Sequence, residues 1–171
     1  MKNYKIQISY NVCGLGKDNT DYYIKAIESI LNQNFDSFHV VLSSCLNTRT
    51  QRNKLRNHFK DKISYCFIDE LVPVPISHNI SVLQYIKYFE EARFYCYVDS
   101  GIDFKEDKLI LQKLYNLANN GPYGLISARA NSDMGQGTVL PKEFDEIILK
   151  NDYIIPLGTA TNAHLFLMHN D

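Results

Sequence analysis

Strand-like and helix-like segments alternate along this chain, and the alternation limits the folds that it can adopt. Strands are predicted from apolar and alternating patterns at residues 4–10, 38–44, 63–69, 93–99, 123–129 and 163–169. Helices are predicted at 19–35, 50–59, 79–92 and 105–120, with a further candidate at 142–151. Strands joined through helices form βαβ units. The sequence therefore predicts an α/β fold with a mainly parallel central sheet flanked by helices.

Small polar clusters end three of the predicted strands. They are Ser9-Tyr10-Asn11, Ser43-Ser44 and Asp99-Ser100. Ligands of parallel α/β sheets bind beyond the carboxyl ends of the strands, so we expect these clusters to converge on one binding site. Asp99 is the strongest candidate, because a carboxylate that ends a run as apolar as "FYCYV" must be desolvated or partnered.

Composition narrows the class of protein and its surroundings. The 171 residues suffice for one domain with a core, and the formal net charge of −1 gives no sign of nucleic-acid or membrane binding. No stretch approaches the ~18 apolar residues of a membrane-spanning helix, and the first residues do not resemble a signal peptide. The four cysteines form no C-x-x-C pair and are expected to be buried thiols. We therefore expect a cytoplasmic protein, with peripheral membrane association left open.

Four stretches resemble one known family. They are "ISYN" (8–11), "YIKAIESILNQNFDSFHVVL" (23–42), "ISHNISV" (76–82) and "YCYVDSGIDFKEDKL" (95–109). In this order they resemble glycosyltransferase family 2, the nucleotide-sugar-dependent enzymes with a GT-A fold. The second stretch is the most specific, since it is very close to the first helix and second strand of that family. The fourth stretch resembles the block that carries the metal-binding D-x-D motif.

The resemblance implies an activity and a set of ligands. It implies transfer of a sugar, with inversion, from a nucleoside-diphosphate sugar of the UDP or GDP type to an acceptor hydroxyl, on a glycan, lipid-linked or protein acceptor. It also implies a divalent cation, Mn²⁺ or Mg²⁺, because carboxylate-held metal neutralises the charge that builds on the leaving diphosphate. The nucleotide-sugar site that it implies comprises Ser9, Tyr10, Asn11, Ser43, Ser44, His78, Asn79, Asp99 and Ser100, with Asp99 and Asp103 at the metal.

Two departures from the family affect the donor site. The second strand usually ends in "VDDGSTD", whose acid contacts the base, whereas this chain reads "LSSCLNT" and offers Ser43 or Ser44 instead. The D-x-D pattern needs an acid at position 101, where this chain has Gly101. Three alternatives follow: Asp103 turns back to the metal, Asp99 holds it alone with waters and phosphates, or the site holds no metal.

A third departure concerns the catalytic base. In the family this Asp or Glu comes after the strand that "NAHLFLMHND" (162–171) resembles, and no convincing counterpart is found among Asp133, Asp171 and their neighbours. The catalytic residue is therefore unassigned. We expect residues 1–171 to form a single GT-A-like domain that lacks the C-terminal acceptor-side segment.

Several structural roles compete with the functional ones. Tyr10 could pack at its strand end, Asn79 could be the N-cap of a helix, and His78 could lie at the surface or in a turn. Asp107 is interpreted as an acid in the first turn of a helix. At the level of the whole chain, the alternatives are a non-catalytic GT-A-like module for nucleotide-sugar binding or assembly, and a nucleotidyltransferase. The second would use "CGLGKDN" (13–19) and its Lys17, a stretch that also reads as an ordinary turn.

Overall fold

A computed structural model describes residues 4–13, 19–100, 102–104, 107–121, 125–127 and 165–169. The candidate helix at 142–151, Lys17, Gly101, Asp133 and Asp171 lie outside these residues. The elements in chain order are β1 (Ile6–Cys13), α1 (Thr20–Leu31), β2 (Phe38–Cys45), α2 (Arg49–Phe59), β3 (Ser64–Ile68), α3 (Val74–Gln84), α4 (Ile86–Glu91), β4 (Phe94–Asp99), α5 (Ile110–Asn120), β5 (Leu125–Ser127) and β6 (Leu165–His169).

The described strands form one sheet in the order β3-β2-β1-β4-β6-β5. The first four strands are parallel, and β6 runs antiparallel to both β4 and β5. The chain leaves β1 toward β2 on one side and later returns to pair β4 on its other side. The topological switch point, where ligands of such sheets bind, therefore lies beside the carboxyl end of β1. The predicted α/β architecture is confirmed.

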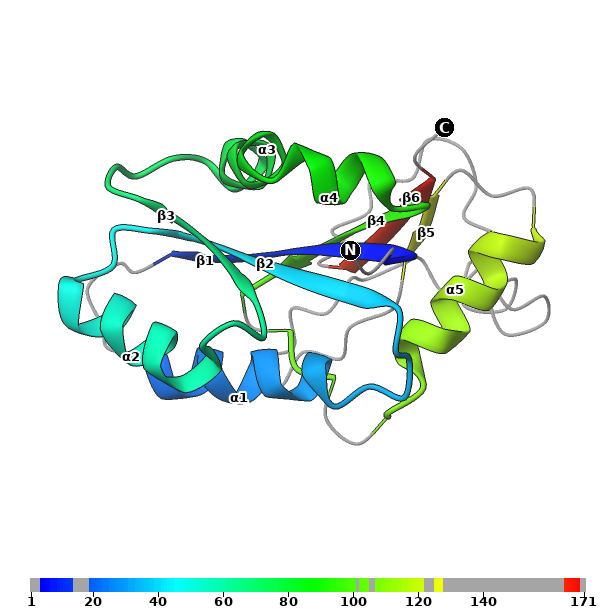
Figure 1. The fold of residues 1–171 in the computed structure, drawn as a ribbon, viewed down its shortest axis with the longest axis horizontal. Coiled ribbons are helices and arrows are strands. Elements are labelled where there is room, and N and C mark those ends of the chain that lie inside the picture. The colour runs from blue at the N-terminus through cyan, green and yellow to red at the C-terminus, as the bar shows by residue number, and fades with distance from the viewer. Residues whose placement is uncertain are drawn as a thin grey trace, which may run out of the picture.

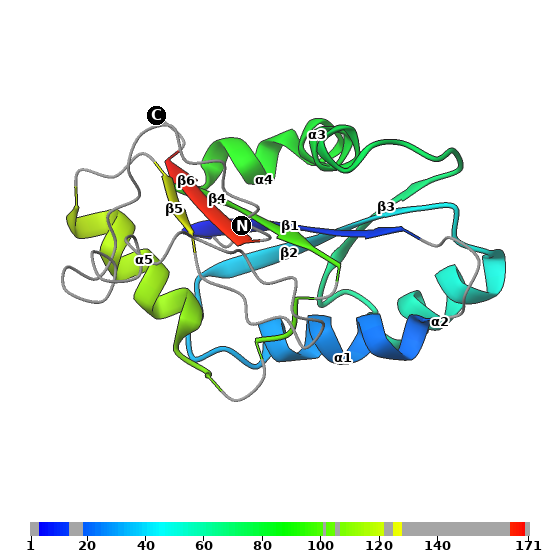
Figure 2. The same ribbon diagram turned by 180° about the vertical axis from the view of Figure 1, so that it is seen from behind.

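Helices cover both faces of the sheet (Figure 1). α1 and α2 lie on one face, while α3 and α4 lie on the other; the view from behind shows the same layers, with α5 beside β5 and β6 (Figure 2). Because side chains alternate along a strand, β1 sends Ile6, Ile8, Tyr10 and Val12 into the main core with α1, α2 and α5. The intervening residues Gln7, Ser9 and Asn11 face α3, and all are buried.

The main core is large and the core under α3 is small. Side chains of α1, α2 and α5 that are at most 4% exposed, Ile27, Ile30, Leu55, Phe59, Leu111 and Leu114, complete the main core. Each stabilises the fold by about 1.5–3 kcal/mol. Under α3 and α4 the buried apolar residues are Val41, Cys66 and Phe89. Ile80 and Val82 of α3 are partly buried against this small core, and hydroxyls and an imidazole make the other contacts between α3 and the sheet.

Two helices begin elsewhere than predicted. The helix predicted at 79–92 begins at Val74, because Pro73 and Pro75 fit at or beside its first residue, and it breaks at Tyr85 (φ −120°, ψ 33°) before α4. Asn79 therefore lies inside α3, and its interpretation as an N-cap was wrong. The helix predicted at 105–120 begins at Ile110. Asp107 precedes it, rather than lying in its first turn.

The segment after β4 is fixed by α1 and the residues that follow it. Ser29 Oγ accepts a hydrogen bond from Phe104 N at 2.9 Å. Gln33 donates to the Asp107 carbonyl at 2.8 Å and accepts from Leu111 N at 3.2 Å. These contacts explain why "AIESILNQNF" combines apolar positions with a serine and a glutamine: its polar residues hold the chain that leaves the end of β4.

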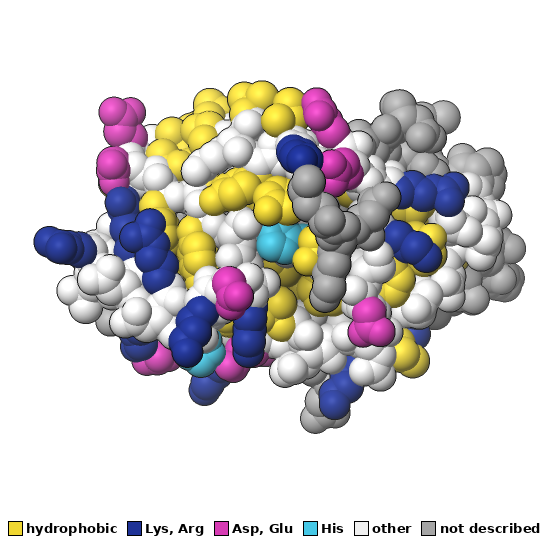
Figure 3. All heavy atoms as spheres, in the orientation of Figure 1, with side chains coloured by type: hydrophobic (Ala, Val, Ile, Leu, Met, Phe, Trp, Pro, Cys, Tyr) yellow, Lys and Arg dark blue, Asp and Glu magenta, His cyan; other side chains and the backbone are white. Residues whose placement is uncertain are grey.

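The outer surface of α3 and α4 is partly apolar. Hydrophobic side chains gather along this edge in the space-filling view (Figure 3), and the exposed ones include Val74, Ile76, Leu83 and Ile86. Among the described helices, none combines the length and the apolar character needed to cross a membrane.

Candidate functional site

The candidate site lies where β1, β2 and β4 end beneath α3. Asn11 pairs in register with Ser43 on β2 and with Asp99 on β4. Register partners on neighbouring strands point to the same face, so these three side chains lie side by side on the α3 face. Together with Ser9 and three α3 residues, Ser77, His78 and Ser81, they form what we call the polar cluster.

α3 contributes its polar side chains through helical spacing. Ser77 and Ser81 are four residues apart and His78 lies between them, so all three face the sheet. They are 1%, 0% and 5% exposed, respectively. Ser43 Oγ donates to the Ser77 carbonyl at 2.9 Å and lies 2.6 Å from Ser77 Oγ. These bonds satisfy hydroxyls that would otherwise be buried unpaired, at a cost of about 1–3 kcal/mol each.

His78 connects β1 to β4. Its Nδ1 lies 2.7 Å from Ser9 Oγ, and its Nε2 lies 3.1 Å from Asp99 Oδ1. The imidazole side chain is 6% exposed, whereas that of Asp99 is 29% exposed. The Tyr97 ring packs against the imidazole edge-to-face at 4.9 Å between centroids. The interpretation of His78 as a turn or surface residue was therefore wrong.

Asn11 has an unusual environment. It is 3% exposed, and its Oδ1 has no hydrogen-bond partner. A buried, unpaired amide oxygen costs free energy, so its presence at a strand end requires an explanation. The Oδ1 is an unused acceptor for an N–H group, and it is buried beneath α3 in this structure.

Neutral groups surround the cluster. Burial raises the pKa of the Cys66 thiol, and a hydrogen bond with Ser43 offsets part of this. Burial also raises the pKa of Tyr97, with a further contribution from Tyr95. Both groups are therefore uncharged near neutral pH; the Tyr97 ring lies against His78, and Cys66 lies next to Ser43.

The predicted site residues fall on both faces of the sheet or outside the cluster. Ser9, Asn11, Ser43, His78 and Asp99 are brought together. Tyr10 is fully buried in the main core, and Ser44 bonds to Asn47 on that same face, so neither joins them. Asn79, Ser100 and Asp103 are exposed. Ser77 and Ser81 were not predicted, although serines at i and i+4, on the same side of a helix as His78, are a signal that could have indicated them.

The resemblance implies a metal site at Asp99 and Asp103, and Gly101 between them lies outside the described residues. Asp99 is the one carboxylate of the polar cluster, and its Oδ1 contacts His78. Nowhere in the described parts of the chain do three or more His, Cys, Asp or Glu side chains group in a way that could hold a metal ion. Metal binding by Asp99 and Asp103 stays a prediction.

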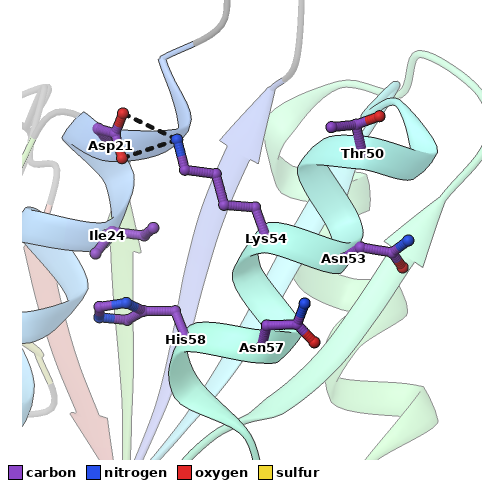
Figure 4. A pocket seen from close by; sticks show the side chains of 7 residues that line it. All are labelled: Asp21, Ile24, Thr50, Asn53, Lys54, Asn57 and His58. Atoms are coloured by element: carbon purple, nitrogen blue, oxygen red, sulfur yellow. Dashed lines mark hydrogen bonds and ion pairs between the residues drawn. The ribbon is translucent and has the colours of Figure 1, made fainter.

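An open groove on the opposite side of the sheet does not extend this site. It lies between α1 and α2 and is lined by Asp21, Ile24, Thr50, Asn53, Lys54, Asn57 and His58 (Figure 4). The Lys54 ammonium reaches across it to Asp21 at 2.9 Å. The sheet separates this groove from α3 (Figure 1).

Comparisons with known proteins identify the fold. No family model and no curated protein sequence matches the chain. Among solved structures, residues 1–349 of TarS from S. aureus are similar, with a TM-score of 0.55 and 17% identity; the match covers 80% of this chain and 38% of that structure. A protein of Desulfovibrio desulfuricans G20, provisionally described as a nucleotide-diphospho-sugar transferase, matches at a TM-score of 0.52 and 11% identity over 88% of this chain and 78% of its own. The chain therefore shares its α/β fold with these two structures, and it spans well under half of the TarS structure.

Proposed function

We propose that this chain is the donor-binding domain of a glycosyltransferase similar to family 2. It binds a nucleoside-diphosphate sugar at the polar cluster and serves transfer of the sugar to an acceptor hydroxyl. The location of the cluster at the switch point of a sheet with this fold supports the proposal. Buried thiols such as Cys66 and Cys96 are compatible with a reducing cytoplasm.

The unpaired Oδ1 of Asn11 carries the proposal. An amide offers an acceptor and a donor side by side. Uracil and guanine each present a ring N–H beside a carbonyl oxygen, which is the complementary pattern, whereas adenine and cytosine lack that ring N–H. Asn11 therefore favours donors of the UDP or GDP type. The part-exposed Asp99 carboxylate, directly opposite on β4, is placed to accept a hydrogen bond from a ribose hydroxyl.

The transfer step requires a base that the polar cluster does not supply. Inverting transfer needs a carboxylate within hydrogen-bond reach of the acceptor hydroxyl. Asp99 is held by His78 beneath α3, and the other cluster members are serines and an asparagine. We therefore propose that the base belongs to the acceptor side, outside the described residues.

A second candidate function is a non-catalytic nucleotide-sugar binding module. The pairing of Asp99 with His78 and the serine pair at the end of β2 favour it, because both leave the site with fewer unpaired carboxylates than a family 2 enzyme. The two candidates share the same donor site and differ in turnover.

Binding of nucleotides tests the proposal. Thermal shift and calorimetry with UDP, GDP and their sugars are expected to show stabilisation, and ADP and CDP should give little. Asp99→Asn should weaken binding, whereas Asp69→Asn, at an exposed aspartate paired with Arg52, should not. Release of free sugar from a UDP- or GDP-sugar would identify an enzyme, and tight binding without release would identify a binding module. Absence of any shift with all nucleotides would rule out both.

A further inference from the structure

A directional chain of hydrogen bonds runs through the polar cluster. Ser81 Oγ lies 2.7 Å from the His78 carbonyl oxygen, which can only accept, so the Ser81 hydroxyl donates there. A hydroxyl has one hydrogen. Toward Ser9, 2.7 Å away, Ser81 therefore accepts, and Ser9 is the donor.

The same reasoning determines whether Nδ1 of the His78 ring carries a hydrogen. Since the Ser9 hydrogen points to Ser81, Ser9 Oγ must accept from His78 Nδ1, which lies 2.7 Å away. Nδ1 therefore carries a hydrogen. This differs from the simplest expectation for a histidine beside a carboxylate, in which a neutral ring carries its hydrogen on the nitrogen that faces the carboxylate.

The other ring nitrogen shares a hydrogen with Asp99. His78 Nε2 and Asp99 Oδ1 are 3.1 Å apart, and two bare acceptors would repel each other at that distance. The hydrogen lies either on Nε2, giving an imidazolium beside a carboxylate, or on Asp99, giving a neutral imidazole beside a carboxylic acid. In both arrangements the pair has no net charge.

We propose that Ser81, Ser9 and His78 position Asp99 and neutralise it, so that the donor site binds its nucleotide without depending on a divalent cation. Mg²⁺ and Mn²⁺ bind ionised carboxylate oxygens. Such an ion would have to displace the hydrogen shared with His78, or bind a pair whose net charge is zero. The nucleotide part of this inference rests on the proposed function; the state of the His78–Asp99 pair does not.

Nitrogen NMR of the histidine rings tests the hydrogen positions without any ligand. In ¹⁵N-labelled protein, His78 is expected to show a protonated Nδ1, with its signals assigned by their loss in His78→Gln. His58, whose Nε2 lies 2.8 Å from Glu28 at the surface, is the internal control. A His78 ring with a bare Nδ1 would overturn the proposal. In Ser9→Ala, the Nδ1 of His78 should no longer carry this hydrogen.

Manganese alone tests the consequence for metal binding. Calorimetry should show weak Mn²⁺ binding to the wild-type chain and at least tenfold tighter binding to His78→Asn, whose shorter side chain keeps an amide near Ser9 but removes the His78 contact to Asp99 Oδ1. The gain should vanish in the double variant with Asp99→Asn. Equal or weaker Mn²⁺ binding by His78→Asn would overturn the proposal.

Nucleotide binding measured with EDTA and with Mn²⁺ distinguishes failure of this proposal from failure of the proposed function. Dissociation constants for UDP or GDP, whichever binds, should differ less than threefold between EDTA and Mn²⁺. A tenfold or larger dependence on Mn²⁺ would overturn cation independence. Failure of every nucleotide to bind would overturn the proposed function and, with it, the nucleotide part of the inference, while the NMR and Mn²⁺ results would still decide the state of the pair.

Discussion

Gln7 and Asn11 are buried amides on the same face of β1, four residues apart. They are 1% and 3% exposed, and the side-chain oxygen of each has no hydrogen-bond partner. The two differ in position: Asn11 lies at the carboxyl end of the strand beside Asp99, and Gln7 lies beside Tyr95, earlier on β4. An unpaired buried oxygen that serves a ligand should cost stability and support binding, whereas one remote from the ligand should only cost stability.

Substitution of these amides should separate stability from function. Asn11→Leu is expected to raise the free energy of unfolding by about 1 kcal/mol, because it removes a buried unpaired oxygen. It should also abolish the thermal shift with UDP or GDP. Urea unfolding and nucleotide titration of the same preparation measure both effects.

Gln7→Met is the matched control. It should raise the stability similarly and leave nucleotide binding unchanged. Equal loss of binding in both variants would show that Asn11 has no special role, and unchanged binding in Asn11→Leu would remove the residue that carries the proposed function.

At the residue scale, the sequence predicted correctly which residues lie at the strand ends, but not which face of the sheet each side chain points to. Ser9, Asn11, Ser43 and Asp99 were correctly expected to converge, because the ends of parallel strands meet at one edge. Tyr10 and Ser44 were grouped with them as sequence neighbours. Alternation in a strand sends adjacent side chains to opposite faces, and only the register with β2 and β4 shows which face is the polar one.

At the scale of elements, α2 begins with a complete capping box. Thr48 Oγ1 accepts from Gln51 N at 3.2 Å, and Gln51 Oε1 accepts from Thr48 N at 2.8 Å. Thr48→Ala should therefore lower the free energy of unfolding by about 1 kcal/mol. Thr50→Ala, at an exposed position two residues later, should have a much smaller effect in the same urea titration. Equal losses would indicate that the box does not stabilise the helix.

The turn before α5 should make stability depend on acid pH. Hydrogen bonds from the Lys113 ammonium and from Leu109 N lower the pKa of Asp107. A carboxyl whose pKa is lowered by folding stabilises the protein above its ordinary pKa, and the contribution is lost as pH falls through the folded value. Asp107→Asn should cost about 0.5 kcal/mol at neutral pH, as exposed pairs do.

The control for Asp107 is pH itself. As pH falls below the ordinary pKa of an aspartate, the difference in unfolding free energy between Asp107→Asn and the wild type should shrink, since the carboxyl is then increasingly protonated in both states of the wild type. A difference that stays constant from neutral to acid pH would show that Asp107 acts through packing rather than charge.

Element boundaries were predicted less well than element order. The apolar stripe of α3 suggested a start at Asn79, but the helix starts at Val74 because prolines are tolerated in a first turn. α5 starts at Ile110 because Gln33 and Asp107 hold the preceding residues in a turn. That constraint comes from α1, far away in sequence, and no local pattern could reveal it.

At the scale of the whole molecule, the alternation of segments sufficed to predict the parallel sheet. It could not reveal that the two layers differ in chemistry. On one face, α1, α2 and α5 bury a continuous apolar core; on the other, α3 contacts the sheet through a small apolar cluster and through hydrogen bonds of serines and of its own His78. This difference arises because side chains alternate between the two faces along β1, β2 and β4. Which residues share a face becomes clear only when the register of these strands is known.

The two layers contain separate thiol reporters. Cys66 lies beneath α3 and α4, whereas Cys96 lies in the main core, and burial raises the pKa of both. A disulfide reagent reacts with thiolates and therefore requires each layer to open. With Cys13 and Cys45 replaced by serine, Cys66 should be modified faster than Cys96, and a nucleotide bound beneath α3 should slow the modification of Cys66 selectively. The rate at which a coloured disulfide reagent modifies Cys66 thus measures how often α3 and α4 separate from the sheet.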